Sequence, residues 1–286
     1  MINFLFFLLI KRKIIFFLNI QNQFLKAEDI KIYIAIPENV YYQKILDIKF
    51  NPQPDSILKE EWGQNLALFK IKNMEPYEEK SFKMEINAIF DFKNKINFYN
   101  KNMEDNLEIY LRDDPYLCMN SDILKKVALN IKKRTKDDLD YIKGVLDTIS
   151  KSLFYSVDGS WQNAEKTFLQ GHGSCSEYSF LFSSLMRLGG LPTRFVGGTM
   201  ERKGGIDLTF HRWVEVFLKD KGWIPVDAQY YDSPESNGKF FPDDERLFLV
   251  TTITPSTSSL LDEWYNFNVK VKKGIIRVNA FFKWEK

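Results

Sequence analysis

A capped helix near the middle of the chain constrains the fold more than any other feature of the sequence. Ser174 and Glu177 fit the capping-box pattern Ser-x-x-Glu, directly before an apolar run over residues 178–188. This pattern predicts a helix with Cys175 in its first turn. The partial positive charge of a helix N-terminus favours a thiolate at that position. A lone cysteine is more often simply buried, so its role depends on what accompanies it.

Two alternating segments follow the helix. Residues 211–217 alternate in character and predict a strand, residues 219–222 predict a turn, and residues 223–227 predict the returning strand. His211 and Asp227 are nearly symmetric about the turn, so both side chains can lie on one face of the hairpin, although the register stays open by one or two residues. A Cys, a His and an Asp in this order supply a nucleophile, a proton carrier and an orienting carboxylate for thiol acyl transfer.

These segments resemble the transglutaminase-like superfamily, whose core is a papain-like fold, over roughly residues 154–227. The resemblance implies that Cys175 is the nucleophile, His211 the base and Asp227 the group that orients it. Two positions depart from the family pattern: Arg212 follows the His, where a small residue is usual, and Ala228 follows the Asp, where Pro is frequent. The motifs that carry the resemblance are Gly-Ser-Cys at 173–175, Arg-Leu-Gly-Gly-Leu-Pro-Thr-Arg at 187–194, His-x-Trp-Val-Glu-Val at 211–216 and Gly-Trp-x-Pro-Val-Asp at 222–227.

Acyl transfer also needs hydrogen-bond donors for the oxyanion. The backbone N–H of Cys175 is the natural first donor, because amides in the first turn of a helix have no partner within the helix. Gln170, just upstream, and the indole of Trp161 are candidates for the second donor. The alternatives are an ordinary loop role for Gln170 and core packing for Trp161.

Composition excludes several other classes of function. The 286-residue chain has a net charge of +2 and dispersed basic residues, which argues against nucleic-acid binding. It has no Gly-rich phosphate loop, and its two cysteines are too few for a zinc cluster. Cys118 is expected to be a buried packing residue, and both thiols are expected to be free. We expect no cofactor and no metal, and the oligomeric state stays open.

The N-terminal segment resembles a signal peptide. Basic residues at 11–13 precede an apolar run at 14–18, and Ala27 offers a small residue for cleavage. Residues 1–27 are therefore predicted to be a signal peptide or a membrane-associated segment, although Met1 need not be the true start. The expected location is exported, periplasmic or extracellular, with possible association with the cell envelope.

The remaining chain predicts an α+β protein of two domains. Apolar residues alternate over 30–36, 46–50, 66–71 and 82–86, which predicts a small antiparallel β-sandwich over residues 28–112. This part resembles the β-rich domain that precedes the core in bacterial secreted members of the family. Residues 113–286 are predicted to form the papain-like transglutaminase core, with a helical part and an antiparallel sheet.

The expected function is cysteine-dependent acyl transfer or hydrolysis on a peptide or protein substrate, through a thioester on Cys175. Resolution by water makes a protease or amidase, and resolution by a lysine amine makes a cross-linking transglutaminase. We expect hydrolysis to dominate. The alternative from a different class is a non-catalytic envelope-binding module that retains the fold.

Overall fold

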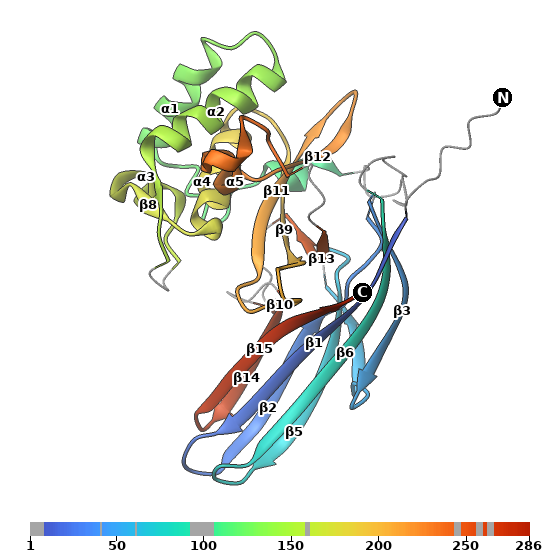
Figure 1. Ribbon diagram of the computed structural model, residues 1–286. Helices are drawn as coiled ribbons and strands as arrows, with labels where there is room; N and C mark the ends of the chain where they lie inside the picture. The colour runs from blue at the N-terminus through green and yellow to red at the C-terminus, as the bar shows by residue number, and fades with distance from the viewer. Residues whose placement is uncertain are drawn as a thin grey trace, which may run out of the picture.

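The computed structural model describes residues 9–40, 42–60, 62–91, 106–157, 161–242, 247–255, 260–261 and 266–286. Helices gather at one end of the molecule and the long strands of a β-sandwich form the other end (Figure 1). The sandwich consists of β1 (Ile10–Asn22), β2 (Ala27–Ala35), β3 (Gln43–Asn51), β4 (Ser56–Lys59), β5 (Asn65–Met74), β6 (Glu79–Phe90), β10 (Ile206–Asp207), β14 (Phe267–Lys273) and β15 (Ile276–Glu285).

The sandwich is built from two antiparallel sheets, with the orders β10-β15-β1-β6-β3 and β14-β2-β5-β4. Alternate residues of each strand point into the space between the sheets, as the two-residue period of a strand requires. The ring of Phe16 lies 4.8 Å from that of Phe282 in the same sheet and 5.8 Å from that of Phe267 in the other. The predicted α+β class and the N-terminal sandwich are therefore confirmed.

The structure corrects the signal-peptide interpretation of residues 1–27. β1 lies between β15 and β6 and pairs with both along most of its length. Ile14, Phe16 and Leu18 are fully buried in the sandwich. Cleavage after Ala27 would remove this central strand, because the apolar run of the expected leader is the inward face of β1. Residues 1–8 lie outside the described part of the chain, and export itself stays a prediction. Within the described residues, no helix is long and apolar enough to cross a membrane.

The predicted domain boundaries also need correction at the C-terminal end. β14 pairs with β2, and β15 pairs with β1, so residues 267–285 belong to the sandwich rather than to the helical core. The helical core is thus inserted between β6 and β14. Strand pairing explains the difference: the central strand β1 has two edges, and the local pattern of the sequence does not say which distant strand pairs with each of them.

The helical core surrounds one buried helix, α4 (Cys175–Leu188), with a four-stranded sheet of order β12-β11-β9-β13 on one side. Its residues from Ser176 to Arg187 are all buried, because helices pack on one flank and the sheet on the other. The further elements are η2 (Leu107–Leu111), α1 (Asp122–Lys132), α2 (Asp138–Ser152), β7 (Phe154–Tyr155), α3 (Ala164–Gln170), β8 (His172–Gly173), β9 (Thr193–Met200), β11 (His211–Leu218), β12 (Gly222–Val226), α5 (Ala228–Asp232), η3 (Pro234–Ser236) and β13 (Phe248–Thr254).

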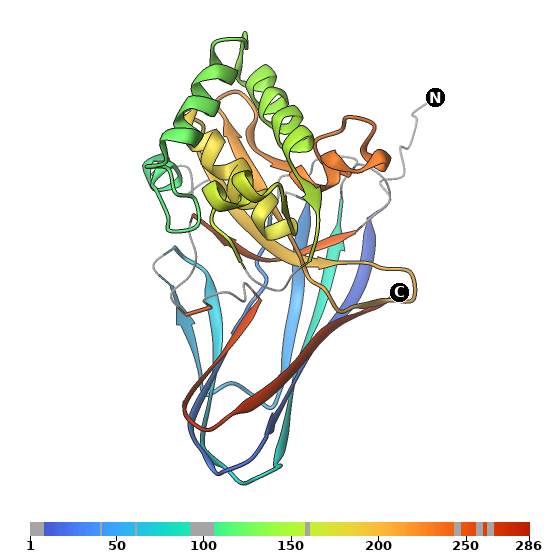
Figure 2. The same ribbon diagram turned by 90° about the vertical axis from the view of Figure 1, so that its left-hand side faces the viewer.

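The sandwich holds the loop that leads into β11. β15 runs up to this loop, which connects β9 with β11 (Figure 2), and pairs there with β10. The backbone N–H of Trp284 donates to the carbonyl of Gly205 at 2.6 Å, and a Cβ at position 205 would lie 2.7 Å from the carbonyl oxygen of Trp284. The Trp284 indole also donates to Thr199 at 3.2 Å. The C-terminal strand therefore fixes the approach to His211.

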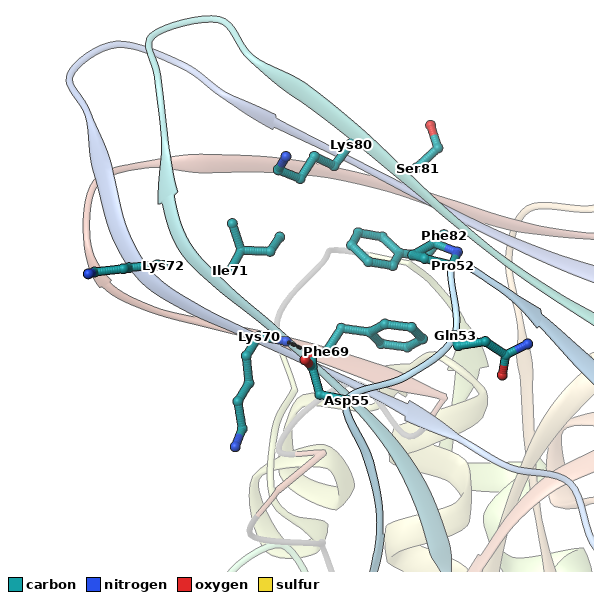
Figure 3. Close-up of a pocket in the computed structure, with 10 residues that line it drawn as sticks. All are labelled: Pro52, Gln53, Asp55, Phe69, Lys70, Ile71, Lys72, Lys80, Ser81 and Phe82. Atoms are coloured by element: carbon teal, nitrogen blue, oxygen red, sulfur yellow. Dashed lines mark hydrogen bonds between the residues drawn. The ribbon is translucent and has the colours of Figure 1, made fainter.

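An open pocket of about 540 Å³ lies on the sandwich, between β5, β6 and the turn after β3 (Figure 3). Asp55 accepts a hydrogen bond from the backbone N–H of Lys70 at 2.6 Å at its margin. The rings of Phe69 and Phe82 contact each other edge to face and are 3% and 4% exposed, so they offer no aromatic platform to a ligand. None of the lining residues comes from the helical core.

Candidate active site

Cys175 is the first residue of α4, as the capping box predicts. Glu177 Oε2 accepts from the backbone N–H of Ser174 at 2.8 Å and from its hydroxyl at 2.5 Å. A Cβ at position 173 would lie 2.5 Å from the Glu177 Cβ, so only glycine allows the loop to fold back on the helix start. The Cys175 side chain is half-buried. The loop and its cap thus place the sulfur at the positive end of a buried helix.

His211 and Asp227 meet as the predicted hairpin requires. His211 Nε2 lies 2.6 Å from Asp227 Oδ2, and both side chains are buried. The strands pair Val214 with Val226, which centres the turn one residue later than perfect symmetry about the two groups would. Asp227 follows β12 and caps α5, where its Oδ1 accepts from the backbone N–H of Tyr230 at 3.0 Å. The cap uses one carboxylate oxygen and leaves the other for the imidazole.

Cys175 and His211 shift each other's pKa through hydrogen bonding and charge. Because Nε2 faces Asp227, Nδ1 is the ring nitrogen left for the sulfur. Burial lowers the pKa of His211, but the charge and hydrogen bond of Asp227 and the contact with Cys175 outweigh it and raise the pKa well above its ordinary value. Burial raises the pKa of Cys175, but the hydrogen bond and charge of His211 outweigh it, and the pKa is lowered. Both directions favour a thiolate–imidazolium pair near neutral pH.

Arg212 is a further charged group at the site, and its contacts were not predicted from the sequence. Its Nη1 donates to the hydroxyl of Ser176 at 2.7 Å, and its guanidinium lies 4.4 Å from the centre of the Trp161 ring. The charge of Arg212 contributes to the lowered pKa of Cys175, after the larger effects of burial and His211. In the sequence, Arg212 was marked by its departure from the family pattern, in which a small residue usually follows the His.

The candidate oxyanion donors make other contacts. Gln170 Nε2 donates to the backbone carbonyl of His172 at 2.9 Å, which holds the loop before Cys175. The Trp161 ring packs against Tyr116 and Phe180 and beneath Arg212. These contacts fit the loop and packing alternatives, and an oxyanion role for either residue stays a prediction. The Cys175 amide lies at the helix start, where a first donor is expected.

The second cysteine lies elsewhere. Cys118 and Cys175 are both free thiols. Burial, followed by the charges of Glu165 and Asp113, raises the pKa of Cys118, opposite in direction to the pKa of Cys175. Cys118 was expected to be buried, but the structure shows it half-buried. Across the described residues, no group of three His, Cys, Asp or Glu side chains could hold a metal ion.

Comparisons with known proteins support the fold. Residues 125–228 match the family model of the transglutaminase-like superfamily. No curated protein matches the sequence. A solved structure, of a candidate cysteine protease from Cytophaga hutchinsonii, matches 97% of this chain and 92% of that chain at 14% identity, with a TM-score of 0.66. The periplasmic domain of TgpA from Pseudomonas aeruginosa matches 77% of this chain and 80% of that chain at 14% identity, with a TM-score of 0.38. The family-model match over residues 125–228 confirms the resemblance to the transglutaminase-like superfamily that the sequence motifs carry.

Proposed function

We propose that the protein catalyses acyl transfer or hydrolysis on peptide or amide carbonyls, with Cys175, His211 and Asp227 as its catalytic triad. The observation that carries this proposal is the contact of His211 Nε2 with the buried carboxylate of Asp227 at 2.6 Å. Burial raises the pKa of Cys175, but His211 outweighs it and lowers that pKa, which supports a pairing of the imidazole with the thiol. A buried carboxylate, an imidazole and a thiol in series form the arrangement that thiol acyl transfer requires.

The Cys175 thiolate attacks the carbonyl carbon and forms a tetrahedral oxyanion, which the backbone N–H of Cys175 stabilises. When the intermediate collapses, the carbon–nitrogen bond breaks and His211 gives its Nδ1 proton to the leaving amine. The acyl group stays on the sulfur as a thioester. His211, now neutral, takes a proton from the incoming water or amine, whose lone pair attacks the thioester and displaces the thiolate. Asp227 holds the imidazole and stabilises its charge throughout.

Water is the acceptor that the charges of the site favour. The guanidinium of Arg212 is a positive charge that acts on Cys175, after the larger effects of burial and His211. A lysine amine is protonated at neutral pH and is repelled by this guanidinium, whereas water is not. We therefore infer a hydrolase of the protease or amidase type, with transfer to amines as a side reaction.

Product analysis tests this proposal. The enzyme is incubated with a peptide library, with and without excess of a lysine-like amine, and the products are identified by mass. Carboxylic-acid products are expected from the wild-type protein and none from Cys175→Ala, whereas Cys118→Ala is expected to match the wild type. Dominant amide products at millimolar amine would show a transferase, and activity retained by Cys175→Ala would refute the thiol mechanism.

A further inference from the structure

We propose that the outer edge of β7 binds an extended segment of the acyl-donor polypeptide and that large apolar side chains of that segment lie against Phe154, Tyr155 and Val157. This inference rests on the proposed function, because it concerns how a peptide carbonyl is brought to Cys175.

One edge of β7 is used within the protein. The backbone N–H groups of Phe154 and Ser156 donate to the carbonyls of Gly171 and Gly173 at 3.0 and 2.9 Å. These bonds pair β7 in parallel with β8, and Tyr155 is the register partner of Gly173, two residues before the nucleophile. The inner edge of β7 is therefore anchored directly to the loop that leads to Cys175.

The other edge of β7 faces outward. In an extended strand, the N–H and C=O groups of successive residues point to opposite edges. Because Phe154 and Ser156 bond to β8, the N–H and C=O of Tyr155 point away from it. Neither group has a backbone partner within the described part of the chain. This donor and acceptor are spaced as an added strand requires.

Large apolar side chains crowd this short segment. Phe154, Tyr155 and Val157 are 62%, 51% and 69% exposed. Neighbouring exposed apolar side chains on a protein surface often mark a binding site. The Phe154 ring lies 5.4 Å from the ring of His172. Burial and then the charge of Cys175 raise the pKa of Tyr155, and Tyr155 is the register partner of Gly173, two residues before Cys175. The apolar surface therefore begins beside the reacting group.

The occupant that fits this edge is a single extended chain. β7 spans Phe154–Tyr155 alone and offers one outward donor–acceptor pair. The surface of two residues is far smaller than the area that a stable protein–protein interface buries. One main-chain pair and an apolar contact are, however, enough to set the register of a substrate whose carbonyl must reach Cys175. The substrate class is thus an unfolded or extended polypeptide with aromatic or large aliphatic residues near the reacting carbonyl.

Tyr155→Pro tests the main-chain contact. Proline removes the outward N–H but leaves the two bonds from Phe154 and Ser156 to β8, and proline is tolerated at strand edges. We expect kcat/KM for a peptide ester donor to fall about tenfold, the loss typical of one hydrogen bond with its geometry. The rate with p-nitrophenyl acetate, which has no chain to bind, should stay unchanged. Tyr155→Ala is the matched control, because it also removes the ring but keeps the N–H, so the tenfold loss is measured against it.

Phe154→Ser and Val157→Ser test the apolar contact. Each should lower kcat/KM for donors with phenylalanine or leucine beside the ester and leave glycine donors unaffected. An unchanged peptide rate in Tyr155→Pro, or an equal loss with p-nitrophenyl acetate, would overturn the inference while the thiol mechanism stands. If neither donor acylates Cys175 in the wild-type protein, the proposed function itself fails, and the inference fails with it.

Discussion

Replacing Asp227 by Asn should separate two tasks that the carboxylate performs at once. Oδ2 faces His211 Nε2 at 2.6 Å, and Oδ1 accepts from the backbone N–H of Tyr230 at 3.0 Å. Both partners present N–H groups when the imidazole is charged. A carboxamide has a single acceptor oxygen, so in Asp227→Asn one of the two donors must face an NH₂ group.

The magnitude follows from these two contacts. Loss of the helix cap would cost about 1 kcal/mol of stability. Loss of the contact to the imidazolium removes a charge-assisted hydrogen bond, worth roughly 1.5–3 kcal/mol. At 1.36 kcal/mol per pKa unit, the second loss lowers the pKa of His211 by about one to two units. A less charged His211 stabilises the Cys175 thiolate less, so the pKa of Cys175 rises toward its ordinary value.

The assay is the rate of alkylation of Cys175 by iodoacetamide between pH 5 and 9, with residue-resolved mass detection. At about pH 6, the variant should react roughly tenfold to a hundredfold more slowly than the wild type. Asp232→Asn is the matched control, because Asp232 accepts from the hydroxyls of Ser150 and Tyr178, which can rotate to accept from an amide. If Asp227→Asn keeps the wild-type pH profile and melting temperature, the assigned roles of both oxygens are wrong.

Three further predictions follow from the same contacts. Arg212→Met should move the alkylation profile of Cys175 to higher pH by up to about one unit, because a positive charge beside the thiolate is lost; an unmoved profile would show that the guanidinium only packs. Cys118 should alkylate only at high pH, since its pKa is raised, and equal reactivity of the two thiols at pH 6 would contradict this. Burial raises the pKa of Asp207, but bonds from Met200, Arg202 and Thr199 lower it below its ordinary value. The charged form of Asp207 thus stabilises the fold above about pH 4. Asp207→Asn should lower the melting temperature at pH 7, and the difference from the wild type should become smaller as the pH falls below about 4. An equal difference in melting temperature at pH 7 and about pH 3.5 would contradict the assignment.

The local parts of the site could be predicted because they depend on short-range rules. The capping box at Ser174 and Glu177 set the start of α4, and the alternation after His211 set the hairpin. The contacts of Arg212 could not be predicted in the same way. They depend on β11 lying against the start of α4, and nothing in the residues near Arg212 shows that Ser176 and Trp161 come within its reach.

The fold was less predictable where strands pair over long distances. Ile14, Phe16 and Leu18 alternate with half-buried or buried neighbours in an almost wholly apolar run, which has the composition of a leader as well as that of a central strand. The pairing of Phe16 with Phe282 joins residues near the two ends of the chain, and no local pattern predicts it. The sandwich therefore contains one strand at the N-terminal end, β1, and two near the C-terminal end, β14 and β15, that the local pattern had placed elsewhere.

The most direct test is to trap the acyl-enzyme. The wild-type protein is mixed with a peptide ester donor, quenched in acid within the first turnover, digested and mapped by mass. An acyl group is predicted on Cys175, labile to hydroxylamine as a thioester is, and strongly diminished in His211→Ala. Turnover of the donor by Cys175→Ala, or an acyl group found on Cys118 instead, would contradict the assignment of Cys175 as the nucleophile.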